Sequence, residues 1–289
     1  MIETTQGTQI LQGPIGIFDS GFGGLTILRE ILERLPGYEY VFLGDNARAP
    51  YGTRSFDMVY RFTLQAVNAL FDMGCPLVIL ACNTASAKAL RTIQQHDLPA
   101  SADPSRRVLG VIRPTAEAVS RMSRSGHIGI FATPGTIASG SYEIEVAHQN
   151  ASLITVGQAC PLWVPLIETG RSDTPGADYF IEQDVKSLFD KDPLIDTVIL
   201  GCTHYPIISE SIKKYLPAGV NMVSQGSIVA DSLADYLHRH PEMNSRLLRT
   251  ADGKPRVTYY TTENPTNFDT LASVFVGHPV AAEQIQLPG

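Results

Sequence analysis

The sequence predicts an α/β protein made of two similar three-layer α/β domains, with mainly parallel sheets related by pseudo-twofold symmetry and a functional site in the cleft between them. Short apolar runs alternate with helical patterns along the whole chain, which is typical of parallel sheets covered by helices. The runs show little alternation of polar and apolar residues, as expected of strands buried on both faces. Two motifs also recur, in the same order, in the second half of the chain.

Strands are predicted where β-branched and aliphatic residues cluster between glycine, proline or aspartate. Apolar residues at helical spacing predict a helix over Leu25–Leu35, ended by Pro36-Gly37, and another over Phe56–Leu70, ended by Gly74. The predicted strands are Ile15–Phe18, Tyr40–Leu43, Leu77–Ala81, Val108–Ile112, Ile128–Phe131, Leu153–Val156, Thr197–Leu200, Asn221–Val223 and Val257–Tyr260.

The internal repeat is carried by two pairs of motifs. Gly16–Ser20 reads GIFDS and Gly129–Thr133 reads GIFAT, while Val78–Ser86 reads VILACNTAS and Val198–Pro206 reads VILGCTHYP. The second copy follows the first by 113 residues in one pair and by 120 in the other. Because the spacings nearly agree and the order is kept, the repeat predicts two domains of similar structure.

Composition and charge narrow the class of protein. The chain has 289 residues and a net charge of −7, a length that buries one large core or two ordinary ones. The acidic balance argues against nucleic acid as a partner. Residues 1–13 are polar and are typical of a flexible N-terminal tail, not of a signal peptide. No apolar run approaches the roughly 20 residues of a membrane span, so we expect a cytoplasmic protein with no membrane partner.

The cysteines indicate thiol chemistry. Cytoplasmic cysteines are reduced, and the CxxC spacing of zinc sites is missing, so we expect no metal. Cys82 and Cys202 each follow an apolar strand of the repeat, at the sheet end where ligand crevices form in α/β proteins. Two such domains facing each other place both thiols on opposite walls of one cleft. Cys75 and Cys160 lack this context and are expected to be packing residues.

Two facing thiols suit the inversion of a carbon stereocentre. One group removes the α-proton from one face of an amino acid, and the other returns a proton to the opposite face. The pKa of a thiol, about 8.5 in peptides, falls beside a helix N-terminus or a cation. We expect one thiolate and one thiol in the working state, and a helix start after each cysteine that favours its anion.

Polar residues beside the two cysteines are candidates for assisting roles. Asp19 and Ser20 precede a glycine-rich turn that lacks the GxGxxG and GK[ST] patterns of nucleotide-binding loops. Asp19 is expected near Cys82, where it accepts a proton-related hydrogen bond or binds the substrate ammonium, although a plain helix cap is the alternative. His204 follows Cys202 by two residues and is expected to stabilise its thiolate or to relay its proton.

Further polar segments end at the same edge of the predicted sheets. Gly44–Asn46 and Pro50–Gly52 form turns after the second strand, and loops at this edge bind ligands. Thr133 and Thr136 lie at the strand end that matches Asp19-Ser20. Their hydroxyls are suited to a carboxylate, or to capping a helix.

Taken together, these motifs resemble the glutamate racemase family. The similar segments are GIFDSGFGGLTIL, GDNARAPYGTRS, ACNTASA, ATPGTIASGSY, ACPLWVPLIETG and LGCTHYP, in family order from about Ile15 to Gly277. The resemblance implies interconversion of L- and D-glutamate without pyridoxal phosphate or another cofactor. It further implies that the D-glutamate serves bacterial peptidoglycan synthesis and that the enzyme is a homodimer.

The resemblance also implies a domain division and a set of site residues. Residues 14–112 with 217–289 form the first domain, and 113–216 form the second. Cys82 and Cys202 are the catalytic acid/bases. Asp19, His204 and Glu168 complete the catalytic group. The residues implied in glutamate binding are Asp19, Ser20, Tyr51, Gly52, Asn83, Thr84, Thr133, Thr136, Thr203 and His204.

Three features depart from the family pattern. Arg113 stands where an acidic residue is more common, and Ser224-Gln225 replace a frequent Asp-Ser pair. Gln94–Arg107 is longer than usual and is predicted to be an exposed loop. None of the three is expected to touch the two cysteines, so they bear on dimer geometry, domain motion and regulation.

Three other hypotheses fit parts of the sequence. An aspartate racemase, or another thiol-based amino-acid racemase, uses the same pair of cysteines. A cysteine hydrolase would use Cys202 as nucleophile and His204 as base, but their closeness in sequence argues against their facing each other, and Cys82 stays unexplained. A two-domain binding module without chemistry is disfavoured by the missing signal peptide and by the paired thiols.

Overall fold

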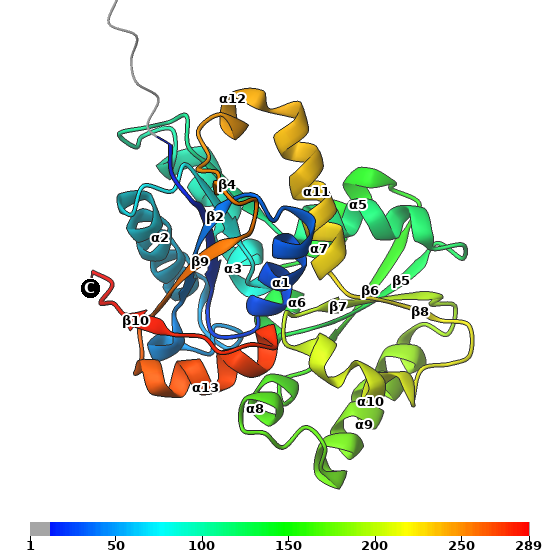
Figure 1. Ribbon diagram of the computed structural model, residues 1–289. Helices are drawn as coiled ribbons and strands as arrows, with labels where there is room; N and C mark the ends of the chain where they lie inside the picture. Colours follow the sequence, from blue (N-terminus) through cyan, green and yellow to red (C-terminus); the bar gives the residue numbers. More distant parts are fainter. Residues whose placement is uncertain (1–11, 289) are drawn as a thin grey trace, which may run out of the picture.

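Two parallel β-sheets organise the chain, which the computed structural model describes from residue 12 to residue 288. The strands are β1 (Ile15–Asp19), β2 (Glu39–Gly44), β3 (Leu77–Leu80), β4 (Arg107–Gly110), β5 (His127–Ala132), β6 (Ile154–Ala159), β7 (Thr197–Gly201), β8 (Asn221–Val223), β9 (Arg256–Thr261) and β10 (Ala282–Gln284). The larger sheet has the order β10-β9-β2-β1-β3-β4, and the smaller has the order β6-β5-β7-β8. In Figure 1 the N- and C-terminal parts of the chain share one domain, and the green and yellow middle forms the other. The predicted fold class, two mainly parallel α/β domains, is confirmed.

Helices flank both sheets (Figure 1). They are α1 (Leu25–Arg34), α2 (Phe56–Asp72), α3 (Asn83–Lys88), α4 (Leu90–Thr92), α5 (Ile112–Met122), α6 (Pro134–Ala138), α7 (Ser141–Gln149), α8 (Trp163–Glu168), α9 (Pro175–Lys191), α10 (Ser209–Lys213), α11 (Gly226–Arg239), α12 (Pro241–Asn244) and α13 (Pro265–Val276), with the 3₁₀ turns η1 (Asn46–Arg48) and η3 (Tyr205–Ile208) and the π-turn η2 (Ile93–Asp97). None of the helices found in residues 12–288 is long and apolar enough to cross a membrane.

Local sequence signals fix several helix ends. The Ser55 hydroxyl accepts a hydrogen bond from the Met58 N–H and caps α2. Thr133 and Thr174 cap α6 and α9 in the same way, each followed by a proline in the first turn. These side chains satisfy N–H groups that have no partner within the helix. The N-terminal ends of the helices after β5 and before β7 are therefore specified by local sequence.

The internal repeat of the sequence is also a structural repeat. β1 pairs with β3 so that Gly16 lies opposite Val78, and β5 pairs with β7 so that Gly129 lies opposite Val198. These four residues begin the four repeated motifs. The strand orders β2-β1-β3-β4 and β6-β5-β7-β8 correspond position by position. The prediction of two similar domains is confirmed, and in each of them the cysteine motif follows the strand paired beside the first strand of the repeat.

The return of the chain to the larger sheet differs from the prediction. β8 pairs in parallel with β7, with Thr197 opposite Asn221, although residues 217–289 were expected to lie in the first domain. The chain leaves the smaller sheet only after Val223, through Gln225 and into α11, which packs on α1. A strand of three residues is too short for its hydrophobic pattern to predict which sheet it joins, because tertiary contacts determine its partner strand.

Three local predictions also need correction. Ile112 begins α5 and does not belong to β4. Gln94–Arg107, predicted as one exposed loop, includes most of η2 and the first residue of β4, so only residues 98–106 connect the two. Gly13, predicted in the flexible tail, is buried: its N–H donates to the Arg246 carbonyl at 2.9 Å, and its carbonyl accepts from Leu248 at 2.8 Å. The rest of that tail, residues 1–11, lies outside the described residues.

The core is continuous across the two domains. One buried apolar cluster contains Ile17 of β1 and Leu28 of α1 in the first domain, and Leu200 of β7 and Leu188 of α9 in the second. Leu188 packs tightly on the smaller sheet, since a Cβ added at Gly129 of β5 would lie 2.7 Å from its Cδ2. The small residue at the start of the repeated motif makes room for this helix–sheet contact.

We predict that Leu188→Ala lowers the free energy of unfolding by about 2–5 kcal/mol, because the truncation leaves a cavity between α9 and β5. Urea denaturation followed by circular dichroism measures the change. Leu194→Ala is the matched control: Leu194 is 61% exposed, and its truncation should cost less than about 0.5 kcal/mol. Equal losses in the two variants would contradict this packing.

Candidate functional site

The two thiols of the repeat lie at the carboxyl ends of β3 and β7. Cys202 directly follows β7, and Cys82 follows β3 after one residue. Cys82 is 5% exposed and Cys202 is 7% exposed. Burial disfavours the charged form of a thiol, so the neighbours of each sulfur decide which of the two carries the proton.

The Cys82 thiol lies in buried surroundings with a carboxyl group close by. Burial raises the pKa of Cys82 to about 12, with contributions from the charges of Asp19 and Cys202. Ser20 Oγ lies 3.3 Å from the sulfur, and the Ala85 N–H donates to it at 3.5 Å. These two contacts favour a thiolate but do not outweigh burial. Cys82 therefore holds its proton at neutral pH.

Asp19 ends β1 beside Cys82. Its Oδ2 accepts a hydrogen bond from the Gly21 N–H at 2.9 Å, whereas its buried Oδ1 has no partner within residues 12–288. Burial raises the pKa of Asp19, and the charge of His204 opposes this shift. Since a buried oxygen without a partner is costly, Oδ1 is suited to accept from an incoming ammonium or thiol. The capping alternative is wrong, because the N-cap of α1 is Gly24.

The Cys202 thiol faces a cation instead. His204 Nδ1 lies 3.8 Å from the Cys202 sulfur, and His204 Nε2 lies 3.0 Å from Glu168 Oε1. Burial lowers the pKa of His204, but its hydrogen bonds to Cys202 and Glu168 outweigh burial and raise the pKa to about 10. His204 is therefore protonated at neutral pH. It places a positive charge beside the sulfur, with Glu168 as its counter-ion.

Two expectations about Cys202 are wrong. A helix start was expected after it, but η3 is a 3₁₀ turn of four residues that begins at Tyr205. The positive charge near this sulfur therefore comes from His204. His204 was also expected to be too close in sequence to face Cys202. A turn closed by the Tyr205 N–H and the Cys202 carbonyl at 3.1 Å brings the imidazole back onto the sulfur.

The glycine-rich turn after β1 allows the first domain to touch the second. A Cβ added at Gly23 would lie 2.2 Å from Thr203 Oγ1 and 2.4 Å from His204 Nδ1. Thr26 Oγ1 donates to the Thr203 carbonyl at 3.0 Å. The His204 ring meets the edge of Phe275 with the ring centroids 5.9 Å apart. The glycine therefore serves close contact between the domains.

Three buried hydroxyls join the domains at a second point. Thr84 Oγ1 of α3 lies 3.0 Å from Thr133 Oγ1 and 3.3 Å from Thr136 Oγ1, and the last two lie 3.1 Å apart. Beside them the Gly135 N–H donates to the Gly52 carbonyl at 2.8 Å. Thr133 also caps α6, so the capping expectation for this residue is confirmed, and its contact with a carboxylate stays a prediction. A cluster of hydroxyls at a helix N-terminus is suited to a carboxylate.

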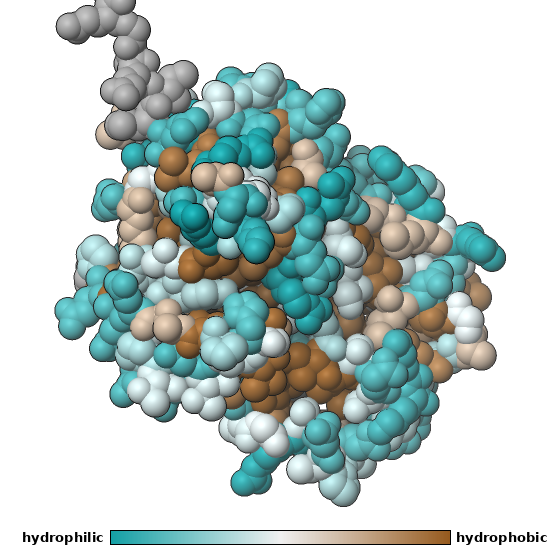
Figure 2. All heavy atoms as spheres, viewed as in Figure 1, coloured by the Kyte–Doolittle hydropathy of each residue, from teal (hydrophilic) through white to brown (hydrophobic). Residues whose placement is uncertain are grey.

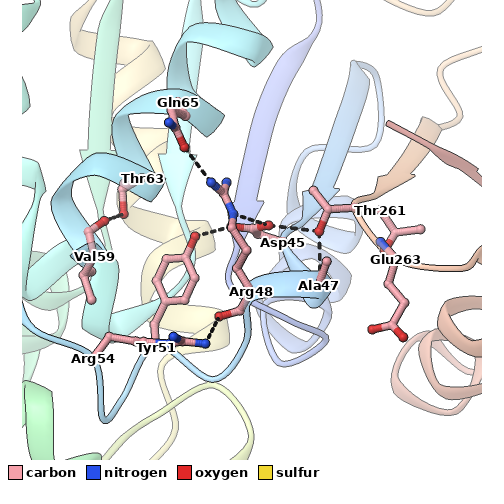
Figure 3. Close-up of polar contacts among 11 residues, drawn as sticks. Asp45, Ala47, Arg48, Tyr51, Arg54, Val59, Thr63, Gln65, Thr261 and Glu263 are labelled. Atoms are coloured by element: carbon pink, nitrogen blue, oxygen red, sulfur yellow. Dashed lines mark hydrogen bonds and ion pairs between the residues drawn. The ribbon is translucent and has the colours of Figure 1, made fainter. Parts of the chain in front are cut away.

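Tyr51 does not present its hydroxyl to this region. Figure 3 shows the hydroxyl pointing at Asp45, to which it donates a hydrogen bond. Asp45 also accepts from Arg48 Nε at 2.7 Å and from Thr262 Oγ1 at 2.9 Å. Burial and the Asp45 charge raise the pKa of Tyr51, so its hydroxyl keeps its proton. Gly52 is the residue of this segment that faces Thr133, since a Cβ added there would lie 2.8 Å from Thr133 Cβ.

Asn83 completes the set of predicted residues. It is the first residue of α3, is 2% exposed, and bonds through its side chain to Tyr142 and Gln225. The contacts described above link the sequence-predicted residues into one region where the two domains meet. Tyr142 and Gln225 were not expected there. Gln225 was noticeable only as a departure from the family pattern, and nothing in the sequence pairs it with Tyr142.

The other two cysteines are Cys75, which packs against Gly16 of β1, and Cys160, which follows β6 and is close enough to Cys202 for the two to affect each other's charge. They are 0% and 1% exposed, and both are free thiols. Burial raises the pKa of Cys75 to about 12 and that of Cys160 in the same direction. The prediction that both are packing residues is confirmed by their burial.

A separate hollow of about 830 Å³ lies between α3, α5, α7 and α11 and is lined in part by Arg113. Neither Cys82 nor Cys202 lines it. Within residues 12–288, no group of three or more His, Cys, Asp or Glu side chains is arranged to hold a metal ion. The candidate site is therefore the buried seam between the two thiols.

Comparison with known proteins identifies the family. The family model of the Asp/Glu/hydantoin racemases matches residues 15–233, and the chain belongs to this family. It is 42% identical to a glutamate racemase of Roseobacter denitrificans, over 91% of this chain and 96% of the relative. A glutamate racemase isoform of Bacillus anthracis superposes with a TM-score of 0.86 at 33% identity, over 96% of this chain and 98% of that one. The Francisella tularensis glutamate racemase, solved in complex with D-glutamate, superposes with a TM-score of 0.83 at 32% identity. The match covers 95% of this chain and 98% of that one.

We predict that Glu168→Gln lowers the pKa of His204 from about 10, because the imidazolium loses its counter-ion. A raised pKa in the folded state stabilises the protein fully below the ordinary histidine pKa of 6.5, and the gain is lost as the pH rises through about 10. The variant should therefore be less stable than the wild type by about 1.5–3 kcal/mol at pH 6, with a smaller difference above pH 10.

Urea denaturation at several pH values measures this difference, and NMR titration of the His204 ring measures its pKa. The control is Glu242→Gln, which removes the carboxylate of the exposed pair Glu242–His240 and should leave stability between pH 6 and pH 10 unchanged. A stability difference for Glu168→Gln that does not vary with pH would contradict a charged His204.

Proposed function

We propose that the protein is a glutamate racemase that interconverts L- and D-glutamate without a cofactor, by a two-base thiol/thiolate mechanism. The observation that carries the proposal is a pair of buried thiols with opposite neighbours, the Asp19 carboxyl beside Cys82 and the His204 imidazolium beside Cys202. The two sulfurs therefore have neighbours of opposite charge. Glutamate as the substrate is supported by the likeness to glutamate racemases, one of which is 42% identical to this chain over 91% of its length.

In the proposed reaction Cys202 is the base for one enantiomer of glutamate. Its thiolate, stabilised by protonated His204, removes the α-proton from the face of glutamate that is turned toward it. His204 keeps its positive charge, with Glu168 as its counter-ion, while the sulfur becomes neutral. This arrangement avoids two thiolates facing each other in a buried site, which their mutual repulsion disfavours.

Cys82 is the acid in the same turnover. Its thiol gives its proton to the opposite face of the α-carbon, and the new thiolate accepts hydrogen bonds from the Ser20 hydroxyl and the Ala85 N–H. The product then has inverted configuration, and the proton has moved from Cys82 to Cys202. The other enantiomer reacts by the same steps in reverse, with Cys82 as the base.

Substrate binding is proposed to use the polar groups around the thiols. The free Oδ1 of Asp19 is suited to the ammonium, and the hydroxyls of Thr84, Thr133 and Thr136 are suited to a carboxylate. Asn83, Gly52 and the other residues of the predicted set lie in the same seam. Because both thiols are less than 9% exposed, glutamate enters only if the two domains separate along this seam.

The cellular role follows the resemblance to the family. We propose that the enzyme supplies D-glutamate for peptidoglycan synthesis and acts in the cytoplasm as a homodimer. Sedimentation equilibrium of the purified chain tests the dimer, and a single species at the mass of one chain, 31.4 kDa, would refute it.

The activity itself is tested by circular dichroism of L-glutamate incubated with the purified protein after dialysis against a chelator. The expected result is decay of the optical signal to zero, with D-glutamate formed, while L-aspartate under the same conditions stays unchanged. Racemisation of L-aspartate with L-glutamate left intact would replace this proposal by an aspartate racemase. No change in either amino acid would refute it.

For the mechanism, we predict that Cys82→Ala and Cys202→Ala each lower kcat by about 10²–10⁴-fold or more, because each variant loses one of its two proton-transfer groups. In single-turnover exchange in deuterated water, each variant should still exchange the α-proton of one enantiomer, and the enantiomer should differ between the two. Cys75→Ala is the control, because it truncates a buried thiol outside the site and should keep its kcat. Exchange of the same enantiomer by both variants would contradict two opposed bases.

A further inference from the structure

A closed ring of hydrogen bonds lies at the junction of the two domains. Asn83 Nδ2 donates to Gln225 Oε1 at 2.6 Å, Gln225 Nε2 donates to the Tyr142 hydroxyl at 2.8 Å, and the Tyr142 hydroxyl donates to Asn83 Oδ1 at 2.7 Å. The three side chains are 2%, 2% and 1% exposed, in the order Asn83, Gln225, Tyr142. They come from α3, from the segment before α11 and from α7, which are far apart in the sequence.

The ring has only one arrangement of donors and acceptors. Gln225 Nε2 uses its remaining proton on Thr115 Oγ1 at 2.9 Å, and Thr115 Oγ1 in turn donates to the Val111 carbonyl at 2.7 Å. If the Gln225 amide flipped alone, its NH₂ would face the Asn83 NH₂. If both amides flipped, the ring would close in the reverse sense, but Gln225 Oε1 would then face the Val111 carbonyl at 3.4 Å and the Thr115 hydroxyl that donates to that carbonyl. Because unpaired buried polar groups cost free energy, the amide is held in a single orientation.

Two members of the ring, Asn83 and Tyr142, each contact one of the two cysteine-bearing segments. Asn83 follows Cys82 in the chain and begins the helix that Cys82 caps. Tyr142 packs on the other segment, since a Cβ added at Gly201 would lie 3.2 Å from Tyr142 Cε2, and Gly201 precedes Cys202. Gln225 bonds to both Asn83 and Tyr142 and lies where the chain crosses from β8 to α11.

We propose that Gln225 is a positioning residue, which fixes the separation of the two cysteine-bearing segments by holding Asn83 and Tyr142 in this buried ring. The inference rests on the proposed racemase function. Gln225 touches neither thiol, so it acts on the reaction only through the placement of the two sulfurs. Opening the ring lets the segments shift relative to each other, and proton transfer is sensitive to displacements of less than an ångström.

The test is steady-state kinetics in both directions with Gln225→Met, which keeps the length of the side chain and removes its polar atoms. We expect kcat to fall by about 10- to 100-fold with a much smaller change in KM, because misplaced groups slow the proton transfer more than they weaken binding. The primary isotope effect with α-deuterated glutamate should rise, since proton transfer becomes more rate-limiting. Tyr142→Phe opens the same ring by removing one oxygen. If Gln225→Met does not fold, the same fall in kcat and rise in the isotope effect are expected in Tyr142→Phe.

The control is Gln158→Met, which removes another buried amide. Gln158 accepts from Ser187 Oγ at 2.9 Å and from Lys191 Nζ at 2.8 Å, and it donates to Asp184 Oδ1 at 3.2 Å, so its amide bonds to neither catalytic thiol and to no member of the ring. It should lower the melting temperature and leave kcat and the isotope effect unchanged. In the double variant of Gln225 and Tyr142 the loss of kcat should be less than the product of the single losses, because one ring is opened twice.

The outcomes separate this inference from the proposed function. Wild-type protein that does not racemise glutamate would refute the function. Wild-type activity together with unchanged kcat and isotope effect in Gln225→Met and Tyr142→Phe would refute the positioning role, whatever their melting temperatures. A loss confined to KM would also refute it, because it would mean that the ring supports binding only.

Discussion

The burial of two thiols where two parallel sheets meet is the constraint on which the rest of the site depends. Parallel strands of one sheet end at the same edge, so each repeat delivers its cysteine there. Because both sulfurs are buried, neighbouring protein groups, and not bulk water, determine which sulfur is charged. The pKa of Cys82 is raised to about 12 by burial and by the Asp19 charge, while Cys202 faces a protonated His204. The fold repeats, but the charged groups beside the two sulfurs differ, and the proposed mechanism depends on this difference.

The same burial makes the site a property of both domains together. The Gly23 turn of the first domain comes so close to Thr203 and His204 that a single added carbon would collide with both. Thr84 of the first domain shares its hydroxyl with Thr133 of the second. Neither domain alone has the charges or the hydroxyls of the assembled seam. Separation of the domains would therefore admit a substrate and dismantle the site, and closure would rebuild it around the substrate in a dry environment.

Most of the architecture could be predicted from the sequence because it is encoded locally or by repetition. The match of GIFDS to GIFAT gave two similar domains, and the residues that begin these motifs occupy equivalent registers in the two sheets. What the sequence did not reveal depends on tertiary choice. The short strand β8 joins the smaller sheet, and the Tyr51 hydroxyl turns to Asp45. His204 reaches Cys202 through a turn that no periodicity encodes. Motif spacing identifies residues that follow strands at one edge of a sheet, whereas tertiary packing determines which side chains contact each other.

The ring of Asn83, Tyr142 and Gln225 shows how such a seam acquires a definite geometry. An apolar junction would tolerate many small displacements at similar free energy, because apolar contacts are not directional. A closed cycle of buried amide and hydroxyl groups is directional, and any shift that breaks one bond leaves a donor and an acceptor unpaired. Gln225 has an oxygen and two N–H protons to offer, so it bonds to α3, α5 and α7 at once. A serine hydroxyl, with its single proton, can donate to only one of them. The departure from the family pattern at this position is therefore a gain in the number of elements tied together beside the thiols.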